Sequence, residues 1–589
     1  MTNQIGRRRL VGLLGGGAAA LLAACGAPPS APTPTTAQPA KPADTKPAAA
    51  PTTAPAAAPT TAPAAAPTTA PATGAATKPA AQATPAAGAA PSAQAAAKPG
   101  QKGGTFNYAE AGDFNDFNPW TYTAVNFELY NQVFSRLTWK DGAGKVNPDL
   151  AESWQLSPDN LSLKLKLRDG VRWHDGKEFT AQDYVTMFGY LKDEALSKHT
   201  GVTKIRGLLS PVKDVVASDR SSLELKFDKP TPFALDLLDY FYAIRIDDKA
   251  DPSFLKKLPV GTGPFKLTEW TANQQARMVK NPDYYNKDLP LLNEVVFKRL
   301  TQAETLLPNL KSGTLDGVLM TSLSDVAPLQ ADKAYTVDVN ENSGSIFNIQ
   351  VNVSKPPFDK KEVRQALSYS LNRVELARSA FFGVSRPIAS AFYSPASIAY
   401  REDLVGAHAF SLDKARQLLD AAGVKSLDLT IVVTPAWPQM KLFSLVWQQD
   451  LKKIGLNLKI NDVENAKFYE INSAKDMQGN DLQAWLNART IRDPAIFWST
   501  QGNYRGGGTS TNRFGFESPE LEKLIADGAA ETDPEKRKKL YQQANEMQIE
   551  QSNVINVATN PRVWAYGKAA GLRVDLNGNL VMDQAALTR

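Results

Sequence analysis

Residues 27–100 are almost wholly Ala, Pro and Thr, and a segment of this composition cannot bury a core. The octapeptide Pro-Thr-Thr-Ala-Pro-Ala-Ala-Ala begins at Pro51 and at Pro59, and nearly repeats at Pro67. Frequent prolines favour a semi-rigid spacer that reaches about 200 Å when fully extended. We therefore expect a disordered linker over 26–102 and a folded part after it. Composition leaves open whether the threonines are glycosylated or the repeats bind a wall polymer.

The first 25 residues have the organisation of an export signal. Three arginines at 7–9 precede an apolar run over 10–22, and Leu-Ala-Ala-Cys ends at Cys25. The run is shorter than the roughly 20 residues that span a bilayer, so it predicts a signal peptide. Leu-Ala-Ala-Cys resembles the lipobox of bacterial lipoproteins, which implies that Cys25 becomes the acylated first residue of the mature chain. The arginines fit either the general or the twin-arginine export route.

Charge and cysteine content restrict the function of the folded part. The formal net charge is +6, and residues 1–102 carry +7 of it, so residues 103–589 sum to about −1. A nucleic-acid partner favours a basic domain, and net charge gives no indication of one. Cys25 is the only cysteine, so the folded part has no disulfide and no thiolate for catalysis or metal binding.

Hydrophobic periodicity predicts alternating strands and helices. Apolar residues alternate with polar ones over 161–167 and 223–227, which indicates two half-buried strands. Thr180 is placed to cap a helix with Tyr184, Val185, Phe188 and Leu191 on one face, and a second helix begins near Asp359 and buries Val363, Ala366, Leu367 and Leu371.

Residues 411–460 give the clearest prediction. Ser411 is placed to cap a helix that Gly423 ends, and a strand follows over 427–433. A further helix, a stop at Gly455 and a strand at 456–460 complete a right-handed βαβ unit. The fold class is therefore α/β, and about 490 residues divide into two or more domains.

Catalytic and metal-binding patterns are absent from the sequence. It contains no H-E-x-x-H, no G-x-S-x-G and no P-loop. The three histidines, His174, His199 and His408, are too scattered to predict a metal site. His174 lies in a Trp-His-Asp-Gly turn that favours a hydrogen-bonded structural histidine. We therefore expect no enzymatic activity, no cofactor and no metal.

A series of segments, in order, resembles the peptide-type extracytoplasmic solute-binding proteins of ABC importers, the dipeptide, oligopeptide and nickel receptor family (family 5). The resemblance covers nearly all of 103–589. Its segments are GGT (103–105), NPDLAESW (147–154), LRDGVRWHDG (167–176), PVGTGPF (259–265), NPDYY (281–285), KSGTLD (311–316), PFD (357–359) and VRQAL (363–367).

The resemblance implies a two-lobed clamp with a hinge and an inserted subdomain, of the type II, cluster C-like kind. It implies that lobe I comprises 103–140, 258–350 and 556–589, that the insert is 141–257, and that lobe II is 351–555. Such a clamp closes because some ligand contacts exist only in the closed state.

The family also implies where ligand binds. Peptide-binding relatives carry a W-x-A-D segment whose aspartate pairs with the ligand's ammonium, and here the position is Ala488, followed by Arg489. A buried ammonium without a carboxylate is costly, so a free-amine peptide is disfavoured. Arg489 and Arg492 favour an anionic or hydroxyl-rich ligand instead, and Asp493 is a candidate substitute for the missing aspartate.

Aromatic side chains in segments that border the cleft of relatives are candidate walls of the site. The full set of candidate ligand-binding residues is Trp120, Tyr122, Trp485, Asn487, Arg489, Arg492, Asp493, Trp498 and Tyr504. Each aromatic residue could instead pack in the protein core. Each arginine could instead form an ion pair within the protein or point into solvent.

The resemblance implies a substrate-binding lipoprotein of an ABC transporter. We expect a monomer anchored to the membrane through acylated Cys25, on the extracytoplasmic face, that delivers a peptide-like or other polar solute to a permease. Three alternatives remain open: a ligand-sensing or wall-associated lipoprotein without transport, a receptor for an oligosaccharide or anionic solute, and an extracytoplasmic hydrolase on the same clamp.

Overall fold

The computed structural model describes residues 101–112, 114, 116–121, 127–197, 202–246, 258–487, 492–505 and 514–588. The predicted signal peptide, the lipidation site Cys25 and the linker lie outside these residues, as do the candidate site residues Tyr122 and Arg489. In the part of the chain that is described, no helix is long and apolar enough to cross a membrane.

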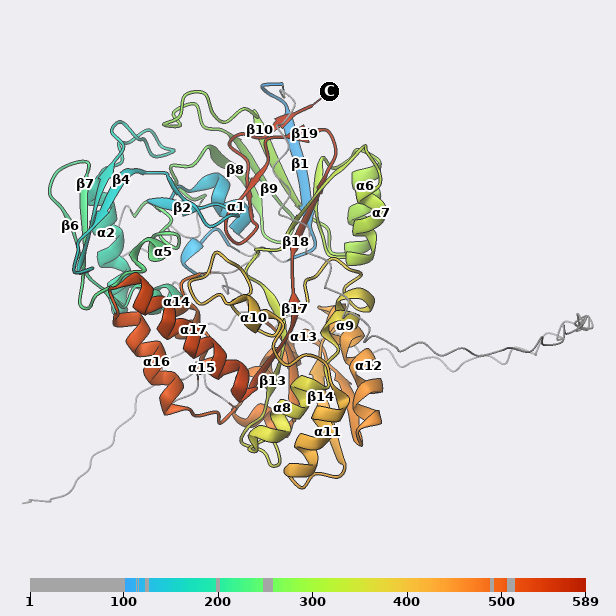
Figure 1. Cartoon of the computed structure of the whole chain (residues 1–589). Helices are drawn as coiled ribbons and strands as arrows, with labels where there is room; N and C mark the ends of the chain where they lie inside the picture. Colours follow the sequence, from blue (N-terminus) through green and yellow to red (C-terminus); the bar gives the residue numbers. More distant parts are fainter. Residues whose placement is uncertain are drawn as a thin grey trace, which may run out of the picture. The chain divides into compact units, whose positions relative to one another are not determined.

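The seven-stranded sheet combines segments from both ends of the folded chain (Figure 1). Its central strand β1 (Thr105–Glu110) runs parallel to β10 (Glu294–Arg299) and β11 (Gly317–Met320). The strand order is β12 (Thr336–Asn340), β18 (Arg562–Tyr566), β11, β1, β10, β9 (Gln275–Lys280) and β8 (Phe265–Thr271). Because β1, β10 and β11 are parallel, their carboxyl ends lie at one edge of the sheet.

The five-stranded sheet contains the predicted strand–helix–strand unit. Its order is β15 (Leu456–Asp462), β14 (Leu427–Val433), β16 (Leu482–Asn487), β13 (Ile346–Val351) and β17 (Val554–Thr559). β14 and β15 are parallel and connected by α12 (Pro438–Lys453). Ser411 caps α11 (Leu412–Ala421) by accepting the Lys414 N–H at 3.1 Å, and Gly423 follows at φ +75°. The predicted strand–helix–strand order and the parallel pair are confirmed.

The four-stranded sheet is antiparallel, in the order β4 (Ala151–Leu156), β5 (Ser162–Leu167), β7 (Ser222–Phe227) and β6 (Val212–Ala217). The alternating apolar side chains of β5 and β7 are buried as predicted. α2 (Ala181–Lys192) packs on β6, and the Thr180 N–H donates to the Asp183 carboxylate at 2.7 Å, as in a capping box.

Shorter elements complete the described fold. The helices around the seven-stranded and four-stranded sheets are η1 (Pro119–Thr121), α1 (Phe127–Val133), α3 (Glu194–Ser197), α4 (Thr203–Leu208), α5 (Ala234–Leu238), η4 (Ala303–Thr305), α6 (Leu306–Lys311), η5 (Leu323–Asp325) and α7 (Val326–Gln330). Those after β13 are α8 (Lys361–Tyr369), α9 (Arg373–Ser379), α10 (Glu402–Val405), α13 (Asn465–Ser473), η6 (Lys475–Gly479), α14 (Pro494–Thr500), α15 (Gly502–Arg505), α16 (Pro519–Ala530) and α17 (Pro534–Gln551). Three two-stranded ribbons pair β2 (Thr138–Lys140) with β3 (Val146–Pro148), β19 (Ala569–Ala570) with β22 (Ala586–Leu587), and β20 (Arg573–Val574) with β21 (Leu580–Val581).

Two short segments connect the seven-stranded sheet to the five-stranded sheet. β12 continues into β13 through 341–345, and β17 continues into β18 through 560–561. The Ser343 hydroxyl donates to the Asn560 carbonyl at 2.7 Å, and the Asn560 N–H donates to the Ser345 carbonyl at 2.9 Å. Two adjacent short connections are the usual construction of a hinge between lobes.

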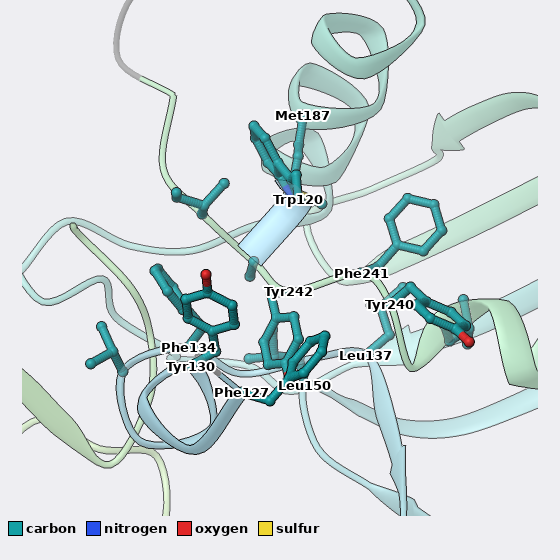
Figure 2. Packing of buried hydrophobic residues seen from close by; sticks show 14 of the residues in the cluster. Trp120, Phe127, Tyr130, Phe134, Leu137, Leu150, Met187, Tyr240, Phe241 and Tyr242 are labelled. Atoms are coloured by element: carbon teal, nitrogen blue, oxygen red, sulfur yellow. The ribbon is translucent and has the colours of Figure 1, made fainter. Parts of the chain in front are cut away.

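Aromatic side chains form much of a buried cluster that joins residues of the seven-stranded and four-stranded sheets. Figure 2 shows Phe127, Tyr130 and Phe134 of the α1 region gathered around Tyr242, with Trp120 beside Met187 of α2. The ring centroids of Phe127 and Tyr130 lie 6.2 Å and 6.0 Å from that of Tyr242. The inserted four-stranded sheet is therefore fixed to its neighbour by a common core.

Gly261 and Gly263, from the PVGTGPF segment, lie directly against α1. A Cβ at Gly261 would fall 2.0 Å from the Val133 carbonyl oxygen, and a Cβ at Gly263 would fall 2.5 Å from the Val133 carbonyl carbon. His174 accepts the Gly261 N–H at 3.3 Å and lies 3.1 Å from the Gly263 carbonyl oxygen. Burial lowers the pKa of His174 to about 4, so it is neutral and structural, as predicted for this turn.

Candidate ligand-binding site

The candidate site lies at the edge of the seven-stranded sheet where the parallel strands end. Glu110 is the last residue of β1, and Arg562 is the first residue of β18, directly after the 560–561 connection. In open α/β sheets, ligands bind outside the carboxyl ends of parallel strands. This edge adjoins both connections to the five-stranded sheet, at the end of β12 and the start of β18.

Two buried carboxyl groups, a buried tyrosine and a partly buried arginine lie together at this edge; we call Tyr108, Glu110, Glu128 and Arg562 the carboxylate cluster. The Arg562 guanidinium donates to the Glu128 carboxylate, and Arg562 Nη2 lies 3.9 Å from Glu110 Oε2. Glu110 and Glu128 are 2% and 0% exposed. Sequence reasoning missed these residues, because Arg562 and Glu128 are 434 positions apart and no local pattern connects them.

The surroundings within the carboxylate cluster shift the pKa values of its two carboxyl groups. Burial raises the pKa of Glu128 to about 7, against the opposing effect of Arg562. Burial, and then the charge of Glu128, raise the pKa of Glu110 well above its usual value. One guanidinium thus faces two carboxyl groups, and near neutral pH these carboxyls carry less than their full negative charge.

Arg492 and Asp239 form a buried ion pair that joins two parts of the molecule. Arg492 lies between β16 of the five-stranded sheet and α14, whereas Asp239 directly follows α5, beside the four-stranded sheet. Their side chains are each 1% exposed, with Nη2 and Oδ2 at 2.5 Å. Arg136 also reaches Asp239, at 2.8 Å. Burial opposes ionisation of Asp239, but Arg492 and Arg136 outweigh it and lower its pKa.

The neighbouring Asp493 is fixed in the same region by different partners. Its carboxylate accepts two hydrogen bonds from Arg537 of α17, at 2.7 and 2.8 Å, and one from the Ala495 N–H at 2.9 Å, which caps α14. The Arg537 guanidinium lies 5.8 Å from the ring centre of Phe233. Asp493 is therefore held by protein partners in this structure.

The candidate aromatic residues fall into three separate places. Trp120 is fully buried with its ring 6.0 Å from that of Tyr190. Trp485 is half-buried on β16, stacked on Phe468 at 5.4 Å. Trp498 and Tyr504 both pack on Phe497, and the Tyr504 hydroxyl donates to Asn556 at 2.6 Å.

Asn487, the last residue of β16, lies at the end of the five-stranded sheet that pairs with the start of β13. Its side-chain oxygen accepts from Asn348 at 2.5 Å, and its side-chain nitrogen donates to Gln501. The structure thus brings Trp498 and Tyr504 together and places Arg492 beside Asp493. Asn487 contacts Gln501, which directly follows α14, whereas Trp120 and Trp485 pack in other clusters.

A polar cavity of about 230 Å³ lies elsewhere, next to the four-stranded sheet, and no candidate ligand residue lines it. Part of its wall comes from the family-like segments identified in the sequence, including Asn147, Asp149, Arg168, Tyr284 and Tyr285. Tyr285 donates to Asp149 at 2.8 Å, and Arg168 lies over the Tyr285 ring at 4.9 Å. These segments therefore contact one another in three dimensions and hold the insert in place.

Among the described residues no three His, Cys, Asp or Glu side chains are grouped to hold a metal ion. His408 is buried, stacked on Tyr369 at 4.5 Å between ring centroids, and 3.0 Å from the Ser368 hydroxyl. Burial lowers its pKa to about 4. The two histidines that the structure describes, His174 and His408, therefore both contact other groups of the protein within its interior.

Three sheets, paired connections and a buried edge between them define the class of two-lobed solute-binding clamps. Residues 145–511 match the family model of bacterial extracellular solute-binding proteins, family 5, and the chain belongs to this family. It is accordingly a substrate-binding protein of the ABC transporter type, and the two-lobed α/β fold expected from the sequence is confirmed.

Individual relatives differ in what their names say they bind. The chain is 28% identical to the dipeptide-binding protein of Escherichia coli K12 over 494 residues, 77% of this chain and 89% of the relative. It is 27% identical to heme-binding protein A of Haemophilus influenzae over 480 residues, 76% of this chain and 85% of the relative. The A. tumefaciens R10 binding protein AgaA, solved with agropinic acid, has a similar fold, with TM-score 0.69, 23% identity and coverage of 82% and 99%.

Proposed function

We propose that this chain is the solute receptor of an ABC importer, which captures a peptide-like or other polar solute between its two lobes and delivers it to a membrane permease. The observation that carries the proposal is the combination of two adjacent connections at 341–345 and 560–561 with a buried ion pair far along the chain from both. The connections permit a hinge motion, and the ion pair gives the closed state a contact of its own.

The Arg492–Asp239 ion pair supports a closing motion because its partners come from different parts of the fold: Arg492 follows β16 of the five-stranded sheet, and Asp239 follows α5 beside the four-stranded sheet. Separation of the lobes would expose Arg492 to water and leave Asp239 with Arg136 alone, whereas closure buries Arg492 against Asp239 at 2.5 Å. The Coulomb attraction in a buried site and the cost of desolvation are both large and nearly cancel. The ion pair then adds little net free energy to closure, and solute contacts can decide the equilibrium.

The solute class follows from which charged side chains remain available. Arg492 was a candidate for binding an anionic solute, but in this structure it is paired with Asp239. The argument for an anionic or hydroxyl-rich solute therefore rests on Arg489 alone. A peptide-like or other polar solute, left chemically unchanged, fits the family better.

A thermal-shift screen of peptides, oligosaccharides and acidic metabolites on the purified protein tests the proposal. One class should raise the melting temperature by an amount that grows with concentration, as RT ln(1 + [L]/Kd) requires. The solute should be recovered unchanged after incubation. Chemical conversion of the solute would favour the hydrolase alternative, and no shift with any class would count against solute capture.

We also propose that the protein is a monomer tethered to the outer face of the membrane through acylated Cys25 and the 26–102 linker. We further propose that lobe I comprises 103–140, 258–350 and 556–589, that the insert is 141–257, and that lobe II is 351–555. Cys25→Ala should move the protein from the membrane fraction to the soluble fraction. A variant with an alanine in the linker, Thr52→Ala, is the matched control and should stay in the membrane fraction.

A further inference from the structure

We propose that Glu110 and Glu128 form the subsite for a positively charged nitrogen of the solute, an ammonium or a guanidinium. This inference rests on the proposed function and names the chemistry of the solute that the clamp selects. It assigns the charge-recognising role to residues of the seven-stranded sheet and of α1.

The first argument is charge balance. Arg562 is the only cation among the described residues within ion-pair distance of Glu110 or Glu128, so one positive charge faces two carboxyl groups. The next carboxylate, Asp575, adds further negative potential at Glu128 and has partners of its own in Asn131 and Asn579. A buried site with an excess carboxylate must either hold a proton or receive a cation.

The second argument is hydrogen bonding. Within the described part of the chain, Glu110 Oε1, Glu128 Oε2 and the Tyr108 hydroxyl are all buried and have no hydrogen-bond partner. Tyr108 is 0% exposed. Buried polar atoms are nearly always paired in proteins, so these three atoms, together with the unpaired Arg562 Nε, indicate that the site is completed by a further polar group, and the two carboxyl oxygens among them call for a donor. An ammonium carries three donors and a guanidinium five.

The third argument is position. Glu110 ends β1 at the carboxyl edge of the parallel strands, where open sheets bind ligands. Arg562 directly follows the 560–561 connection, so a cation bound there acts beside the hinge.

Proton release connects the subsite to a measurement. Burial raises the pKa of Glu128 to about 7, so without a cation the pair holds a proton over part of the neutral range. A bound ammonium stabilises the ionised form, and the displaced proton passes to the buffer. Titrations in two buffers of different ionisation enthalpy at pH 6.5 should therefore show proton release on binding.

The test compares amines with their acetylated forms, using trialanine with N-acetyltrialanine and glucosamine with N-acetylglucosamine within the screen described above. The best-bound solute should carry a cationic nitrogen and should bind about 30-fold or more tightly than its acetylated form. Glu110→Gln and Glu128→Gln should abolish most of this preference and the proton release. Gln resembles the protonated side chain in shape, so both variants should fold, which a circular-dichroism melt checks.

Asp338→Asn is the matched control. Asp338 lies on β12 of the same sheet, accepts a hydrogen bond from Tyr566 at 2.7 Å, and has a pKa raised by burial, but it lies outside the carboxylate cluster. It should leave the preference for the amine unchanged. A best solute without a cationic nitrogen, or an unchanged preference in both Gln variants, would overturn the subsite and leave the proposed function standing. Failure of every solute to bind would remove the proposed function as well.

Discussion

The Arg492–Asp239 ion pair and the carboxylate cluster are both buried, yet their charges are arranged in opposite ways. Asp239 has two guanidinium partners, Arg492 and Arg136, and its pKa is lowered despite burial. Glu110 and Glu128 share one guanidinium, and burial raises their pKa values. The comparison indicates that well-paired charges hold elements of the protein together, whereas an excess carboxylate is available to a proton or a ligand.

We expect the largest loss of stability from replacing Asp239. This replacement tests most clearly whether the Arg492–Asp239 ion pair, unlike the carboxylate cluster, holds the fold together. Asp239→Ala leaves two buried guanidinium groups without their shared carboxylate and should lower the free energy of unfolding by about 3–5 kcal/mol. Urea denaturation followed by circular dichroism measures this. The exposed pair of Glu375 and Arg378 is the control, and Glu375→Ala should leave the urea midpoint unchanged.

Asp493→Asn should have a smaller effect than Asp239→Ala. The two hydrogen bonds from Arg537 lose their charge assistance, but Asn still caps α14 by accepting the Ala495 N–H. We expect a loss of about 1–3 kcal/mol in the free energy of unfolding. If Asp493→Asn lowered the free energy of unfolding as much as Asp239→Ala, the loss of stability would not depend on how many charged partners the carboxylate has.

Glu128→Gln tests the carboxylate cluster, through the dependence of protein stability on pH. In the folded state the pKa of Glu128 is raised to about 7, above its unfolded value, so the folded state binds the proton more tightly. The stabilisation is present below the unfolded pKa and is lost as pH rises through about 7. Unfolding between pH 5 and 8 should show a flatter pH dependence in Glu128→Gln than in the wild type. An unchanged slope would show that Glu128 does not titrate there.

We expect the smallest loss of stability from a change in the polar cavity next to the four-stranded sheet. Burial raises the pKa of Asp149 to about 6, and its carboxylate accepts from Tyr285 and from the Arg136 N–H. Tyr285→Phe removes one of these hydrogen bonds and should cost about 1 kcal/mol. Since no residue of the carboxylate cluster lines the cavity, the preference for an amine should not change. A changed preference would connect the two regions.

Local features of the fold were predictable, and long-range ones were not. The alternation in β5 and β7, the caps Thr180 and Ser411, and the βαβ unit follow from neighbouring residues, because periodicity and capping are local. The candidate site required contacts between distant segments. Arg492 was predicted as a ligand residue, whereas in the structure it pairs with Asp239, about 250 positions away. Glu110 and Glu128 gave no local signal.

The central claim is that the two lobes close on a solute and that the Arg492–Asp239 ion pair belongs to the closed state. Spin labels at Lys164→Cys on β5 and Lys523→Cys on α16, both exposed, report the separation by pulsed electron resonance in a Cys25→Ser background. The solute found in the screen should shift the distances to one shorter population, and Asp239→Ala should weaken that shift. An identical distance distribution with and without saturating solute would contradict the account.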